Sequence, residues 1–89
     1  MINTIGLQKI FNFYGEKNQM VKLIEELSEL TIEIAKFLNQ DKRSDFDNLL
    51  SEVADVFVIL LQLKSHFDID ENELIKKINY KIGRTLLRI

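Results

Sequence analysis

Residues 20–38 read MVKLIEELSELTIEIAKFL, and this stretch decides the fold class. Its apolar positions recur at intervals of three and four residues, which is the period of one face of an α-helix. The chain has no proline and only three glycines, so little interrupts helix formation. The positions that keep this rhythm are Met20, Leu23, Ile24, Leu27, Leu30, Thr31, Ile34 and Leu38. We therefore expect a long amphipathic helix here.

Two helices are expected in the first half of the chain. Residues 4–13 form a short first helix that ends near Gly15. Asn18 is a suitable N-cap for the second helix, which runs to about Leu38 and ends in the polar run 39–41.

Two more helices are expected in the second half. Ser44 with Asp47 resembles a capping box and starts a third helix that ends near His66. Asp70 with Glu73 starts a fourth helix that runs to the C-terminus. No apolar run alternates with period two, so no strand is predicted. Residues 1–89 are thus predicted to form one all-α domain, a small bundle of about four helices.

Composition narrows the function classes. Net charge is only −2, so no overall field favours nucleic acid or a membrane surface. The absence of cysteine excludes a disulfide framework, a thiolate nucleophile and a zinc–cysteine site. No signal peptide and no apolar stretch of about 18 residues is found. The sequence indicates a soluble, cytoplasmic protein with no membrane or nucleic-acid partner.

The apolar content predicts assembly. Hydrophobic residues make up 46% of the chain, more than one apolar stripe per helix requires. A chain of this length buries only about 60–65% of its unfolded surface, so a lone monomer would be marginal. We expect homo-oligomerisation to complete the bundle.

Two carboxylate pairs are the main chemical signal: Glu26 with Glu29, and Glu52 with Asp55. Residues three apart on a helix have Cβ atoms about 5–6 Å apart, so each pair shares a face. On amphipathicity alone, Glu26 and Glu29 form, with Glu33, a solvated face opposite the apolar one. For Glu52 and Asp55, the solvated and the functional interpretations are balanced.

The pattern of the third helix adds information about the second pair, Glu52 and Asp55. Its first half is amphipathic, with Phe46, Leu49, Leu50, Val53 and Phe57 opposite Asn48, Ser51, Glu52 and Asp55. Residues 56–61 are apolar on every side, which predicts burial on every side. Val58 and Ile59 should therefore meet protein, which places Glu52 and Asp55 at the rim of a covered region.

A basic stripe lies on the last helix: Lys77, Lys81, Arg84 and Arg88. One interpretation is a solvated face that suits the helix dipole. The other is a set of donors for phosphate oxygens. Together with the acids, the stripe would suit a metal-bound polyphosphate.

Other residues give weaker indications of function. A surface or capping role is favoured for His66, and core packing or an interface for Phe11, Phe13 and Tyr14, although these aromatic rings could stack on a base. No glycine-rich phosphate loop exists, which excludes a P-loop mechanism. No Ser-His-Asp or Cys-His arrangement can be assembled either.

The order of three motifs resembles the MazG-like, all-α nucleoside triphosphate pyrophosphatases. The motifs are Glu25-Glu26-Leu27-Ser28-Glu29-Leu30, then Glu52-Val53-Ala54-Asp55-Val56, then Lys81-Ile82-Gly83-Arg84. The resemblance extends roughly from Gly15 to the C-terminus. Ser28 stands where glycine is frequent, the chain is shorter than many members, and no tryptophan is present for base stacking.

The resemblance implies Mg²⁺-dependent hydrolysis of a nucleoside triphosphate, often a deoxy or non-standard one, to the monophosphate and pyrophosphate. It implies that Glu26, Glu29, Glu52 and Asp55 are the catalytic metal ligands, with Glu25 or Glu33 as an auxiliary acid. Mn²⁺ is a substitute for Mg²⁺. Lys81 and Arg84, extended by Lys77 of the same stripe, would bind substrate phosphates. The implied assembly is a homodimer or a dimer of dimers.

Three alternatives stay open. The chain could be a non-catalytic helical oligomerisation module, or a degenerate relative that binds nucleotide and regulates a partner. A nucleic-acid binder using the basic stripe is the third, although the acid pairs would repel the same phosphates.

Overall fold

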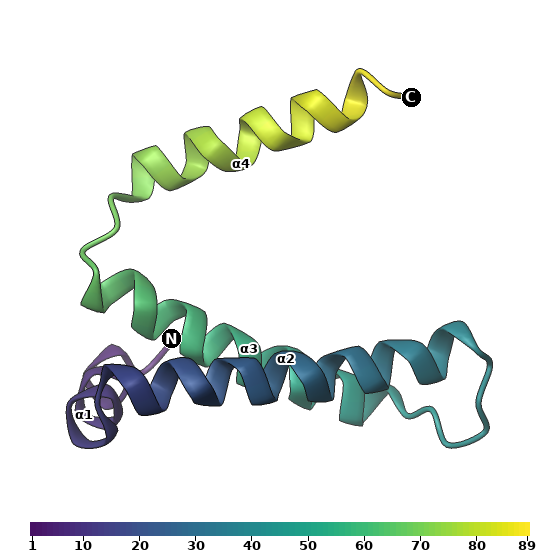
Figure 1. Ribbon diagram of the computed structural model, residues 1–89, viewed down its shortest axis with the longest axis horizontal. Coiled ribbons are helices and arrows are strands. Elements are labelled where there is room, and N and C mark those ends of the chain that lie inside the picture. Colours follow the sequence, from purple (N-terminus) through teal and green to yellow (C-terminus); the bar gives the residue numbers. More distant parts are fainter.

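A computed structural model describes all 89 residues, and the protein is entirely helical (Figure 1). Four helices follow one another: α1 (Thr4–Tyr14), α2 (Glu16–Leu38), α3 (Phe46–His66) and α4 (Glu71–Leu86). The predicted class, helix number and absence of strands are confirmed. No helix combines the length and the apolarity needed to cross a bilayer.

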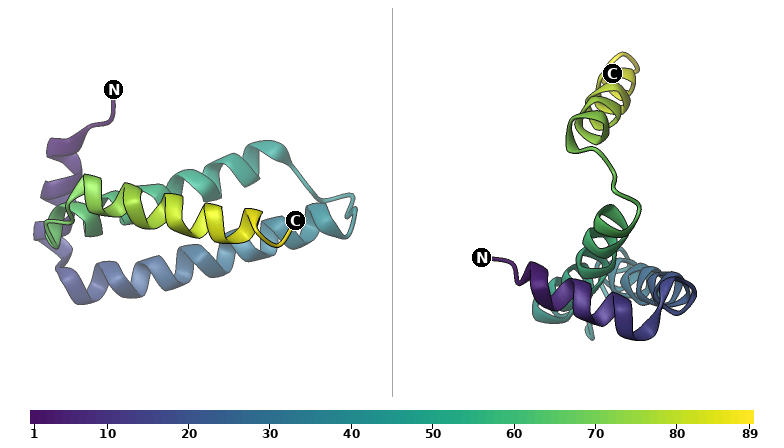
Figure 2. Two further views of the ribbon diagram at one scale, coloured as in Figure 1. Left: turned by 90° about the horizontal axis from the view of Figure 1, so that it is seen from above. Right: turned by 90° about the vertical axis from the view of Figure 1, so that its left-hand side faces the viewer.

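Helices α2 and α3 form an antiparallel pair, and α1 packs across one end of it (Figures 1 and 2). Helix α4 makes no close contact with any of the other three and stands apart from them in both figures. We call α1–α3 the body and residues 71–89 the arm. Three of the four helices pack together within the single chain, and the completion of the bundle by homo-oligomerisation stays a prediction.

Gly15 separates α1 from α2. Its φ of 87° lies in the left-handed region that glycine adopts without strain, so the chain turns there within one residue. The second helix then starts at Glu16, which makes the prediction of Asn18 as its N-cap wrong. The Asn18 side chain instead donates to the Tyr14 carbonyl at 2.7 Å.

The later caps were predicted with mixed success. Asp70 accepts a hydrogen bond from the Glu73 backbone N–H at 3.0 Å, as expected. Ser44 does not cap α3, because Asp45 lies closer to the helix start and accepts from the Asp47 N–H at 2.8 Å.

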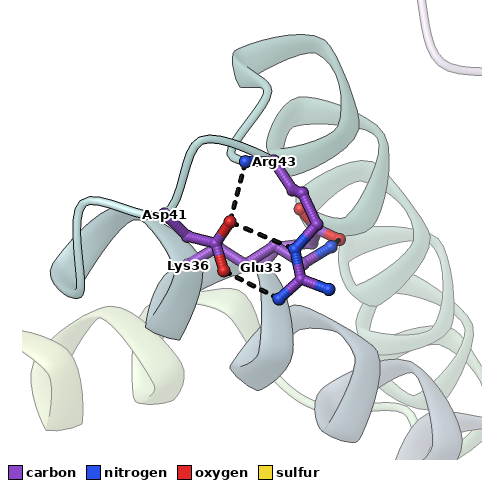
Figure 3. Close-up of polar contacts among 4 residues, drawn as sticks. All are labelled: Glu33, Lys36, Asp41 and Arg43. Atoms are coloured by element: carbon purple, nitrogen blue, oxygen red, sulfur yellow. Dashed lines mark hydrogen bonds and ion pairs between the residues drawn. The ribbon is translucent and has the colours of Figure 1, made fainter.

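The loop from α2 to α3 is held by Asp41 and Arg43 (Figure 3). Arg43 donates its backbone N–H and its Nε to Asp41 Oδ1, at 2.7 and 3.1 Å, and its Nη2 to Oδ2 at 2.8 Å. The guanidinium, followed by the backbone N–H, lowers the pKa of Asp41 to about 2. Beside this loop Lys36 pairs with Glu33 at 3.0 Å (Figure 3).

In the body, polar side chains pack inside while most of the predicted apolar faces point outward. Only three apolar residues are buried, namely Phe11, Val56 and Ile59, and three polar ones are buried with them: Gln19, Glu26 and Gln62. On α2 the predicted apolar face is largely outward, with Ile24 65% and Leu38 79% exposed. The expectation that Glu26 belongs to a solvated face is wrong, since it is 4% exposed and faces α3.

Helix α3 follows the same arrangement. Its predicted apolar face points outward, and Phe46, Leu50 and Phe57 are each more than half exposed. Of the two residues expected to meet protein, Ile59 is 3% exposed but Val58 is 39% exposed. The single chain leaves its most hydrophobic helix faces uncovered.

His66 ends α3 beside the first helix. Its ring lies 4.3 Å from that of Phe11, centroid to centroid, and its Nε2 lies 3.1 Å from Glu16 Oε2. The three residues join the ends of α1, α2 and α3. A structural role for His66 and Phe11 agrees with the prediction.

Candidate metal centre between α2 and α3

Three acidic side chains converge where the middle of α2 faces the middle of α3. Glu26 comes from α2, and Glu52 and Asp55 come from α3, one turn apart. One carboxylate oxygen from each lies within 4.8 Å of the others. The structure thus brings together three of the four acids that the sequence singled out.

Two of these acids contain oxygens that are buried and unpaired. Glu26 Oε1 lies 3.0 Å from Lys22 Nζ, but Glu26 Oε2 has no hydrogen-bond partner. Glu52 Oε2 is likewise buried without a partner. An unpaired buried carboxylate oxygen is costly, because it has lost water and gained nothing in exchange. A cation bound between Glu26 and Glu52 would satisfy both oxygens, and Glu33 Oε2, outside the cluster, is unpaired in the same way.

The negative charges in the cluster repel one another. Burial raises the pKa of Asp55, the Glu26 carboxylate raises it further, and Lys22 opposes the shift. Burial also raises the pKa of Glu52, followed by the charges of Glu29, Asp55 and Glu26. Glu52 and Asp55 therefore bind protons more tightly than isolated carboxyls do, and a divalent cation would replace these protons.

The donor set fits Mg²⁺. Carboxylate oxygens are hard ligands, and bonds of about 2.0–2.1 Å in an octahedron set ligand oxygens about 2.9–4.2 Å apart. Spacings of up to 4.8 Å need only a small inward movement of side chains that now repel one another. Glu26, Glu52 and Asp55 would hold the ion, and Mn²⁺ would suit the same oxygens.

Glu29 lies next to the cluster and not within it. It is exposed on α2, one turn after Glu26, and its charge acts on Glu52. It is absent from the group of oxygens that meet within 4.8 Å. The structure therefore places the fourth predicted ligand at the edge of the site.

The two auxiliary acids differ in position. Glu25 is exposed and borders the cavity described below, 3.8 Å from Lys22. Glu33 is partly buried, pairs with Lys36, and lies outside the cavity. Of the two, only Glu25 borders the cavity.

The basic stripe is not brought to the acids. Lys77, Lys81 and Arg84 are exposed on α4, which contacts neither α2 nor α3. Within one chain, the basic side chain beside the cluster is that of Lys22, which the sequence interpretation missed. Its position one turn before Glu26, on the same helix face, could have revealed it.

An open cavity of about 520 Å³ adjoins the cluster. Glu26 and Asp55 form one part of its wall, and Ile10, Tyr14 and Ile59 form an apolar part. The remaining residues in its lining are mostly polar: Asn18, Gln19, Val21, Lys22, Glu25, Val58 and Gln62. The volume lies within the range of about 300–1,000 Å³ that small-molecule sites occupy.

Two buried glutamines position this wall. Gln19 Nε2 donates to Gln62 Oε1 at 2.7 Å, and Gln62 Nε2 donates to the Leu7 carbonyl at 3.3 Å. One amide pair therefore links all three helices of the body. The sequence interpretation missed both residues, although Gln62 is a single polar residue in the otherwise apolar run 56–63.

The raised pKa values predict a pH dependence. Without divalent cation, the free energy of unfolding should fall as pH rises above about 4. Unfolded Asp and Glu carboxyls titrate near 3.8 and 4.5, whereas folded Asp55 and Glu52 keep their protons to higher pH. The stability these groups contribute is present below their unfolded pKa values and is lost as pH rises through the folded ones.

Urea unfolding in EDTA, followed by circular dichroism, measures this slope. A Glu52→Gln/Asp55→Asn double variant should show a flatter dependence over the same range. Mg²⁺ should remove most of the fall in the wild-type chain. An identical slope in the double variant would show that other groups cause it.

Comparisons of this chain with protein-family models, with curated proteins and with solved structures find no match.

Proposed function

We propose that this protein is a Mg²⁺-dependent nucleoside triphosphate pyrophosphohydrolase that releases the monophosphate and pyrophosphate. The observation that carries the proposal is the convergence of Glu26, Glu52 and Asp55, two of them with unpaired buried oxygens, beside a cavity of about 520 Å³. The motif order described above supplies the reaction class. The proposed setting is the cytoplasm, with the chain assembled as a homodimer or a dimer of dimers.

The residues would divide the work as follows. Glu26, Glu52 and Asp55 would hold Mg²⁺, and Lys22 would contact a phosphate oxygen from the same side. When bound, Mg²⁺ would neutralise charge that develops on the phosphate oxygens. Glu25 would accept the proton of the attacking water, because it borders the cavity without belonging to the three-acid group.

The nucleoside would occupy the rest of the cavity. Tyr14 offers an aromatic ring, and Asn18 offers an amide that could pair with a base edge. The amides of Gln19 and Gln62 are largely committed to each other and to the Leu7 carbonyl, so they shape the wall.

A panel of canonical and modified (deoxy)nucleoside triphosphates tests the reaction. Each is incubated with the protein and Mg²⁺ and scored for monophosphate and pyrophosphate. Pyrophosphate from any of them supports the proposal. Nucleoside diphosphate with inorganic phosphate would mean that a different bond is cut, and no product from any of them would contradict it.

The outward apolar faces of α2 and α3 favour a second candidate, a helical oligomerisation or nucleotide-binding regulatory module without turnover. A thermal-shift comparison separates the candidates. Mg²⁺ with nucleotide should not stabilise an oligomerisation module. It should stabilise a regulatory module without any product being formed. An enzyme should be stabilised and should also form product.

Glu29→Gln tests the fourth predicted ligand. We expect it to lower the rate of pyrophosphate release by about tenfold to a hundredfold, because Glu29 lies beside Glu52 and adds negative charge to the site. A Mg²⁺ titration of activity measures the change in affinity for the ion. Glu71→Gln, an exposed glutamate on α4, is the control, and an active Glu29→Gln protein would remove Glu29 from the ligand set.

A further inference from the structure

The chain exposes far more surface than a folded monomer of its mass. It exposes 7479 Å², whereas a compact protein of 10.5 kDa exposes about 5,400 Å². Its radius of gyration is 15.7 Å, against about 12 Å expected for 89 residues. The excess of about 2,000 Å² per chain matches what an obligate dimer buries, since such interfaces span about 2,000–5,000 Å² in total.

Part of this excess lies on α4. The helix is amphipathic, and Ile75, Ile78 and Ile82 lie along one side, each about half exposed. An isolated helix of 16 residues is marginal in water unless its apolar face is covered. Nothing in its own chain covers it.

A matching apolar face points outward from α3. Phe46, Leu50, Val53, Phe57 and Leu60 are spaced by four, three, four and three residues. On α4, Ile75, Ile78, Ile82 and Thr85 are spaced by three, four and three. The stretch on α3 covers about 21 Å of helix and the one on α4 about 15 Å, and both follow the heptad spacing with which paired helices interlock.

Charge complements the two surfaces. The first 70 residues carry twelve acidic and seven basic side chains, a net charge of −5. Residues 71–89 carry two acidic and five basic side chains, a net charge of +3. Attraction between copies therefore favours contact of an arm with a body over contact of two bodies or two arms.

The charges also choose the direction of packing. Each helix is viewed along its axis from its own N-terminus. In this view the basic stripe lies to one side of the apolar face of α4, and Glu52 lies to the same side of the apolar face of α3. When two helices pack antiparallel through their apolar faces, the basic stripe and Glu52 lie on the same side of the contact. When they pack parallel, the two lie on opposite sides. Antiparallel packing thus sets Lys77 and Lys81 beside Glu52.

We propose that α4 of one copy packs antiparallel on the outward apolar face of α3 in a second copy, so that Lys77, Lys81 and Arg84 of one chain complete the acidic site of the other. The assignment of these bases to a substrate site rests on the proposed function. The packing of the arm does not, because it rests on surface, spacing and charge.

Association is tested first, by sedimentation equilibrium. The wild-type chain should dimerise, and Ile78→Gln/Ile82→Gln should raise the dissociation constant by at least about a hundredfold. Glu73→Gln/Lys76→Gln has the same number of changes, keeps the net charge and removes only an exposed ion pair, so it should change the constant little. A monomeric wild type, or an isoleucine variant that associates like the wild type, overturns the proposal.

Cross-linking identifies the contact, since the chain has no cysteine of its own. One copy is tagged and carries Ala54→Cys on α3, and the other is untagged and carries Asn79→Cys on α4. In the proposed antiparallel pair, both cysteines lie on the same side of the contact between the apolar faces. A short bismaleimide should join tagged to untagged chains. Tyr80→Cys, on the far side of α4, should not react in this way. No cross-link between copies, or a cross-link only within a chain carrying both cysteines, would mean that the arm does not exchange.

Mixing tests the shared site. Glu52→Gln copies and Lys81→Ala/Arg84→Ala copies should each be nearly inactive, and their mixture should regain about a quarter of wild-type activity, since half of the dimers contain one intact site. No recovery despite cross-linking would confine the site to one chain. A wild type that cross-links but hydrolyses no nucleotide would overturn the proposed function and leave the arm packing standing.

Discussion

Asp55→Asn is expected to lower the Mg²⁺-dependent rate of pyrophosphate release by about a hundredfold to a thousandfold. The asparagine keeps the size of the side chain but removes a negative charge from the three oxygens that meet within 4.8 Å. Single-turnover assays at saturating Mg²⁺ separate a slower reaction from weaker metal binding. Asp47→Asn, the same change in the first turn of α3, is the matched control.

The same substitution should act on stability in the opposite direction. Burial and the Glu26 carboxylate raise the pKa of Asp55, so folding makes its charged form less favourable. In metal-free buffer at pH 7, Asp55→Asn should therefore raise the melting temperature. Addition of Mg²⁺ should reverse the order, because only the wild type keeps all three carboxylates. A variant that is both inactive and less stable in EDTA would indicate a general structural defect.

Gln62→Ala is expected to have the largest effect on folding. The side chain is 2% exposed, and its hydrogen bonds link α3 to both α1 and α2. Its loss leaves a cavity and strands the buried Gln19 amide, which should lower the free energy of unfolding by about 2–4 kcal/mol.

Urea unfolding at fixed protein concentration measures that change. Gln8→Ala is the control, because Gln8 is an exposed glutamine whose hydrogen bonds to Asn12 and Ser65 lie at the surface. A Gln62→Ala effect no larger than that of Gln8→Ala would show that the buried amide pair does not hold the helices together.

The helices could be predicted from the sequence because their signals are local. Gly15 and Asp70 act on the backbone within one turn, and each ends or starts a helix where expected. The misplaced caps, Asn18 and Ser44, lie one to three residues from the helix boundaries that form. Asp45 caps α3 in place of Ser44, whereas α2 starts after Gly15 without a side-chain cap.

The packing could not be predicted in the same way. Amphipathicity reports which face of a helix avoids water, and it does not report which molecule covers that face. The body joins α2 to α3 through Gln19, Glu26 and Gln62, so the face interpreted as solvated became the internal one. Within one chain, α4 likewise makes no contact with the body that would fix its position.

The candidate site was predicted in part for a related reason. Glu52 and Asp55 were recognised from the apolar run that follows them, and Glu26 chiefly from the order of motifs. The cavity, with Lys22 and Tyr14 in its wall, required the crossing of α1 over the other helices. That crossing depends on contacts between residues far apart in the sequence, such as Leu7 with Gln62.

The direct connection between α2 and α3 has a kinetic consequence. The two helices that carry the acids are neighbours in sequence, and only the seven residues 39–45 separate them. Contacts between sequence neighbours form early, since closing a loop of about ten residues takes only about 10–100 ns and low contact order goes with fast folding. The carboxylates should thus come together in a nascent chain before the arm has been synthesised, so that an ion could act on the folding of a single hairpin.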